Sequence, residues 1–132
     1  MKTIKQFKIA GILVMVLGVI HTLASPLIIV EFRSLYINTL LCFAYMFIAT
    51  GIFTFALGWL QYFVLRKIID HSSFLILLKA TVVLAVISGI GAVATMWTNP
   101  FAYLMLLIAL YECILLRIVL QKGIDKLIAT KK

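Results

Sequence analysis

Long apolar stretches separated by short polar breaks run along the whole of this 132-residue chain. A helix needs about 20 residues, at 1.5 Å each, to cross about 30 Å of hydrocarbon. Four stretches meet this requirement, and we predict helices over residues 9–30, 35–65, 74–97 and 101–121. Runs of this length exceed the roughly ten residues of a membrane β-strand, so the spans are expected to be helical.

The breaks between the apolar stretches are short and polar. Residues 31–34, 66–73 and 98–100 leave room only for tight connections, which place consecutive helices antiparallel. The pattern therefore predicts an all-α membrane protein, an up-down-up-down four-helix transmembrane bundle in one domain over residues 1–132. The second span is longer than the hydrocarbon requires, so we expect it to tilt or to project beyond the bilayer.

Composition supports a membrane location. Hydrophobic residues make up 65% of the chain and charged residues 12%, whereas soluble domains carry about 25% charged residues. Mean hydropathy is +1.22. We expect the lipid bilayer of an inner or plasma membrane to surround the protein.

The position of the basic residues predicts the orientation. The net charge is +8, and eleven of the 12 basic residues fall at the N-terminus, around the second break or at the C-terminus. Arg33 alone lies on the other side. By the positive-inside rule both termini are cytoplasmic, and no nucleic-acid partner is expected. Residues 1–25 resemble a secretory signal, but we expect them to stay as the first helix.

Small residues recur at helical spacing in three spans. Such residues let membrane helices approach closely, so the faces that carry them are expected to turn inward. They could equally line an interface between copies of the chain or with a larger membrane complex. The residues are Gly11, Gly18 and Ser25 in the first span, Gly51, Thr54 and Gly58 in the second, and Ala85, Gly89 and Ala92 in the third.

Two ionisable residues interrupt the apolar spans. His21 lies about 18 Å along the helix from Ile9, and Glu112 lies about 14 Å from Gln121. Counted from one common edge, both are near mid-membrane. A carboxylate facing lipid is costly, so Glu112 should face the bundle, become neutral or find a partner, for which His21 is the best candidate. The pair could bind a ligand or a proton, or could only fix the helix register.

Other polar residues surround this predicted site. Possible hydrogen-bonding neighbours are Thr22, Ser25, Asn38, Tyr45 and Tyr111. An outer rim of Glu31, Arg33, Trp97 and Asn99 could form the mouth of a cavity, although such residues are also common interfacial anchors. Trp59, Gln61 and Tyr62 are interpreted as anchors near the other end of the second span.

No established catalytic or metal-binding motif occurs in the chain. Cys42 and Cys113 are too far apart for a CxxC pair, and we expect buried thiols that pack as small apolar groups. Neither HExxH nor GxSxG is present. We therefore predict no catalytic set, no metal and no cofactor.

Three functional hypotheses follow. In the first, the bundle binds or moves a proton or a small apolar or amphipathic ligand at His21 and Glu112. In the second, it is a non-catalytic subunit, assembly factor or immunity-type factor that contacts another membrane protein through its helices. In the third, it is a membrane-embedded enzyme that uses Glu112 and His21 on a lipid-phase substrate.

Overall fold

All regular secondary structure in the described part of the protein is α-helical. A computed structural model describes residues 2–67 and 74–122. Four segments in these ranges are long and apolar enough to cross a membrane, as the sequence predicts. The helices are α1 (Lys2–Leu23), α2 (Ser25–Glu31), α3 (Ile37–Lys67), α4 (Phe74–Thr95) and α5 (Pro100–Lys122).

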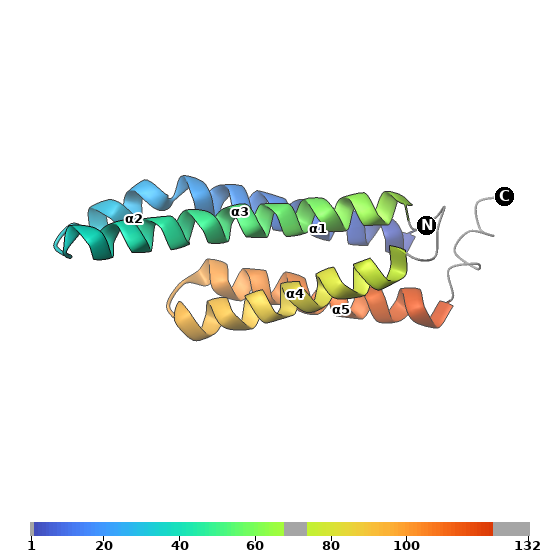
Figure 1. Ribbon diagram of the computed structural model, residues 1–132. Coiled ribbons are helices and arrows are strands. Elements are labelled where there is room, and N and C mark those ends of the chain that lie inside the picture. Colours follow the sequence, from blue (N-terminus) through green and yellow to red (C-terminus); the bar gives the residue numbers. More distant parts are fainter. Residues whose placement is uncertain (1, 68–73, 123–132) are drawn as a thin grey trace.

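The four long helices form a ring. The first two, α1 and α3, make one antiparallel hairpin, while α4 and α5 make the second (Figure 1). The most extensive packing is between α1 and α3, and the ring is closed by contacts of α1 with α5 and of α3 with α4. The other two pairs, α1 with α4 and α3 with α5, face each other across the centre.

A short break divides the first span into α1 and α2. Ala24 lies between the two helices, and Pro26 stands in the first turn of α2. Proline has no backbone N–H to donate and its ring crowds the preceding turn, so the continuous helix ends here. Ala24 N still donates to Ile20 O at 2.9 Å and Ile28 N to Ala24 O at 3.4 Å, so backbone hydrogen bonds continue on both sides of the break.

Glycines bring the backbones of α1 and α3 into direct contact. Gly11 faces Gly58, and Gly18 faces Gly51. A Cβ atom added at Gly58 would lie 2.5 Å from Gly11 O, and one added at Gly18 would lie 2.7 Å from Gly51 O. Both pairs obey the same antiparallel register, seven residues apart on each helix, so they set which levels of α1 and α3 lie side by side. The inward placement predicted for these small residues is confirmed.

The α1–α3 hairpin is longer than its partner. The span that contains α1 and α2 covers 30 residues and α3 covers 31, against 22 for each of the other two spans. At 1.5 Å per residue the difference is about 12 Å, and α2 with the start of α3 extends past the turn between α4 and α5 (Figure 1). This end exposes large side chains, among them Leu27, Tyr36 and Tyr45. The predicted extra length of the second span is confirmed.

The cysteines correct one expectation. Both thiols are free, but Cys42 is exposed and Cys113 is only half-buried. Cys42 lies on the projecting end of α3, where no helix of the second hairpin is present to cover it.

The glycine contacts generate a stability prediction. Gly18→Ala would place a methyl group against the backbone of Gly51 and Phe55, which cannot rotate away as a flexible side chain could. We expect the substitution to lower the free energy of unfolding by about 1–3 kcal/mol, even though alanine favours helix. Thermal unfolding in detergent, followed by circular dichroism, measures the effect.

Gly91→Ala is the matched control. It is the same chemical change within a helix, but a Cβ atom at Gly91 meets nothing within 4 Å. This variant should unfold at the wild-type temperature or slightly above it. Equal midpoints for the two variants would contradict the proposed role of Gly18.

Candidate functional site

A hydrogen bond between two buried side chains crosses the centre of the bundle. Gln61 Nε2, on α3, donates to Glu112 Oε2, on α5, at 2.8 Å. Both residues are 0% exposed. The bond therefore joins the two helices that face each other diagonally, one from each hairpin. Glu112 faces the bundle interior, as expected from its sequence.

The pair leaves two buried oxygen atoms without a partner. Glu112 Oε1 and Gln61 Oε1 are both inaccessible and make no hydrogen bond. A buried polar atom without a partner costs about 1–3 kcal/mol. In the described part of the chain, the buried side-chain atoms without a hydrogen-bond partner are these two oxygens, and both belong to the Gln61–Glu112 pair.

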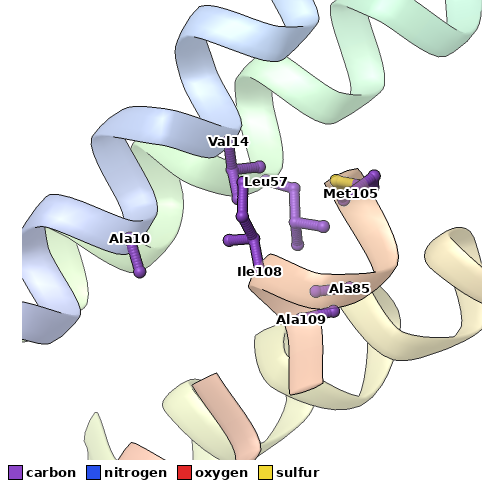
Figure 2. Close-up of a cluster of buried hydrophobic side chains, with 7 residues drawn as sticks. All are labelled: Ala10, Val14, Leu57, Ala85, Met105, Ile108 and Ala109. Carbon is purple, nitrogen blue, oxygen red and sulfur yellow. The ribbon is translucent and has the colours of Figure 1, made fainter. Parts of the chain in front are cut away.

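Apolar layers lie on both sides of the pair. The central apolar layer (Figure 2) separates it from the projecting end of the bundle, and the basic-end apolar layer lies toward Lys2 and Lys67. The central apolar layer consists of Ala10, Val14, Leu57, Ala85, Met105, Ile108 and Ala109. The basic-end apolar layer consists of Phe7, Val64, Leu65, Leu78, Val82 and Leu115.

Glu112 and His21 lie at different depths. The Gly11–Gly58 and Gly18–Gly51 contacts place Gln61 level with residue 8 of α1, and His21 is thirteen residues, or about 20 Å, farther along that helix. Glu112 bonds to Gln61 and therefore shares its level. The sequence-based depths were measured from Ile9 for His21 and from Gln121 for Glu112, as if these two residues lay at the same edge of the bundle. In the structure Ile9 lies near the level of Glu112, so the two depths have different origins. The expected His21–Glu112 pair is therefore not formed, and Glu112 bonds to Gln61 instead.

His21 has a separate environment near the other end of the bundle. Its ring is stacked on Phe47 of α3, with centroids 3.7 Å apart and an angle of 21° between the planes. The side chain is half-buried. This stacking holds the plane of the imidazole ring against Phe47. His21 also lines a cavity.

All four long apolar segments contribute to the cavity beside His21, which we call the His21 cavity. Its volume is about 70 Å³. Its polar residues are His21, Thr50, Thr54, Ser88 and Asn99, and its apolar ones are Leu17, Phe53, Ala92, Met96, Phe101, Ala102 and Met105. Met105 also belongs to the central apolar layer, which therefore forms the floor of the cavity.

Of the outer-rim candidates, only Asn99 reaches the cavity. Asn99 Oδ1 also accepts a hydrogen bond from Phe101 N at 3.0 Å, which caps the start of α5. Glu31, Arg33 and Trp97 are exposed outside it.

The expected neighbours of His21 have other roles. Thr22 Oγ1 donates to Gly18 O at 3.0 Å and packs on Gly51, and Ser25 is buried at the start of α2. Asn38 and Tyr45 are exposed on the projecting end. Tyr111 lines an open groove between α1 and α5.

Gln61 was interpreted as an interfacial anchor, and this interpretation is wrong. The side chain is fully buried because it lies on the small-residue face of α3, where Gly51, Thr54, Gly58 and Gln61 follow one another at steps of three or four. That spacing was the signal in the sequence that could have found it. Trp59 is exposed, in keeping with an anchor.

Thr50, Thr54 and Ser88 were not predicted as cavity residues. The two threonine hydroxyls already donate to backbone carbonyls of their own helix, at 2.7 and 2.9 Å. The small-residue face of α3 indicated that Thr54 turns inward, but a threonine bonded in this way has no further signal in sequence that distinguishes a packed position from a cavity.

Comparison of the chain with protein families, with curated proteins and with solved structures found no match. The Gln61–Glu112 pair and the His21 cavity are therefore the features from which a function is inferred.

The buried pair generates a prediction about stability. Among the described residues, Gln61 is the one that donates to Glu112, so Gln61→Met should leave the carboxyl group without this bond and cost about 1–3 kcal/mol in unfolding free energy. Adding Glu112→Met replaces both polar groups by unbranched apolar ones and should recover most of this loss. Thermal unfolding of both single variants and the double variant in detergent measures the coupling. Additive losses would show that the two residues do not interact.

Proposed function

We propose that this protein is an integral membrane protein that binds a small amphipathic molecule in the His21 cavity. The observation that carries the proposal is that all four spans line one cavity, with the polar and aromatic groups described above. Ligand sites in proteins typically combine apolar walls with a few oriented polar groups.

The cavity determines the chemistry of the ligand. A volume of about 70 Å³ accommodates a small polar head group rather than a whole drug-sized molecule. His21 and Ser88 can each donate or accept a hydrogen bond, while Phe53 and Phe101 offer apolar contact. The ligand class is therefore a molecule with a small hydrogen-bonding head and an apolar remainder that lies toward the bilayer.

Binding is better supported than movement across the membrane. The central apolar layer lies between the His21 cavity and the Gln61–Glu112 pair. A solute that enters at His21 therefore meets packed side chains, including Val14 and Leu57, before it reaches the basic end.

The charge distribution supports an orientation with the N-terminus and the end of α5 in the cytoplasm. Lys2, Lys5, Arg66 and Arg117 lie toward the end of the bundle opposite the projecting α2 and carry exposed side chains. Basic residues favour the cytoplasmic face of a membrane. In this orientation the His21 cavity lies toward the outer face of a cell or inner membrane.

The orientation is tested by labelling single cysteines in intact cells. After replacement of Cys42 and Cys113 by serine, a cysteine at Ser34 or Thr98 should react with a membrane-impermeant maleimide, because both positions lie in the turns on the outer side. A cysteine at Thr3 should react only after lysis. Labelling of Thr3→Cys in intact cells would reverse the orientation.

Ligand binding is tested by thermal unfolding of the purified protein with medium-chain alkanols, alkylamines and alkanoic acids as probes. A bound probe raises the unfolding midpoint in a saturable way. We expect at least one class to do so, and His21→Phe to weaken its apparent affinity about tenfold, or ~1.4 kcal/mol. Phenylalanine keeps a ring against Phe47 and removes the ring nitrogens.

Asn38→Ala is the matched control, because Asn38 is an exposed polar residue outside the cavity. It should leave the probe response unchanged. If no class shifts the wild-type midpoint, or if Asn38→Ala weakens the response as much as His21→Phe, the binding proposal fails. The subunit hypothesis would then be favoured, since the projecting end exposes apolar side chains such as Leu27 and Tyr36 that a partner could cover.

A further inference from the structure

The two unpartnered oxygens of the Gln61–Glu112 pair are both hydrogen-bond acceptors when the carboxyl group is ionised. An ionised carboxylate can only accept hydrogen bonds, and an amide oxygen can only accept them as well. Glu112 Oε1 and Gln61 Oε1 therefore cannot bond to each other as long as the carboxyl group is ionised.

Rotating the amide group does not remove the difficulty. If the nitrogen and oxygen of Gln61 exchanged places, the amide oxygen would face Glu112 Oε2, which now accepts the 2.8 Å bond. The amide nitrogen would then turn toward Glu112 Oε1, so one bond and one contact between two acceptors would remain in either orientation.

No basic residue or thiol near the pair donates a hydrogen bond to Glu112 Oε1 in the described part of the chain. Arg66 and Arg117 are each five residues, or about 7.5 Å along the axis, from Gln61 and Glu112 toward the basic end, and both are exposed. Lys8 and Lys79 are the basic residues nearest this level on α1 and α4, and neither bonds to Oε1. The neighbouring Cys113 is half-buried and also makes no bond to it.

A metal cation does not fit the same position. Sites for hard cations provide about six oxygen ligands, whereas this pair offers two free oxygens between apolar layers. No cluster of three metal-ligating acidic, histidine or cysteine side chains occurs in the described ranges. A proton needs only one donor and one acceptor atom.

We propose that Glu112 is a proton-binding site, in which the protonated carboxyl group donates from Oε1 to Gln61 Oε1 while Oε2 accepts from Gln61 Nε2. The acid and the amide then form a neutral ring with two hydrogen bonds, and both buried oxygens are satisfied. The site does not depend on the ligand proposed for the His21 cavity, which lies beyond the central apolar layer.

Proton release at this site is linked to packing at the basic end. Without its proton, Glu112 would be a buried anion with one donor, which is strongly unfavourable next to apolar side chains such as Leu115 and Val82. Loss of the proton from Glu112 therefore requires water to pass these apolar side chains. Because each hairpin contributes one residue of the pair, the hydrogen bonds that the protonated group makes join the two hairpins.

Infrared spectroscopy of the protein in lipid vesicles at neutral pH tests the proposal. The difference between wild type and Glu112→Gln should contain the C=O stretching band of a protonated carboxyl group. In Gln61→Met this band should persist and move to higher frequency, because the carbonyl oxygen Oε2 loses the hydrogen bond that it now accepts from Gln61.

Glu31→Gln is the matched control, because Glu31 is exposed and its removal should leave the protonated-carboxyl band unchanged. A carboxylate band in place of the protonated-carboxyl band in the Glu112→Gln difference would overturn the proposal. A protonated-carboxyl band that does not move in Gln61→Met would also overturn it, since the ring with Gln61 would then be absent. If Glu112→Gln does not fold, the shift in Gln61→Met still decides the result.

Discussion

Direct backbone contact between α1 and α3 is the constraint on which the other features of the bundle depend. In an apolar solvent the hydrophobic effect does not hold helices together, so association relies on close packing, which small residues permit. Gly11, Gly18, Gly51 and Gly58 supply it at two levels one heptad apart. The register of these contacts places Gln61 near the basic end of the bundle and His21 near the projecting end.

The core of the bundle is arranged in levels along its axis. From the projecting end, the His21 cavity is followed by the central apolar layer, the Gln61–Glu112 pair and the basic-end apolar layer. The polar residues of the His21 cavity and the Gln61–Glu112 pair thus lie at two separated levels. The separation explains why a histidine and a glutamate that each interrupt an apolar helix belong to two sites, and it allows ligand binding and proton binding to be tested independently.

The two hairpins contribute differently to this arrangement. The α1–α3 hairpin carries most of the close helix packing and both Gln61 and His21, while the α4–α5 hairpin contributes Glu112 and one wall of the cavity. Between α4 and α5 the close approach occurs at Gly89, beside Leu106. Because the Gln61–Glu112 bond joins the hairpins across the ring, a change at this bond affects how they fit together.

The sequence by itself determined the number of long apolar spans, their antiparallel order and the inward small-residue faces, because these follow from apolar length and from helical spacing within one segment. It also showed that Glu112 must avoid lipid, since a charge there is costly at any register. Only the tertiary structure decided the partner. Axial register between helices depends on where the backbones touch, and the glycine contacts placed Glu112 beside Gln61 and left His21 about 20 Å away.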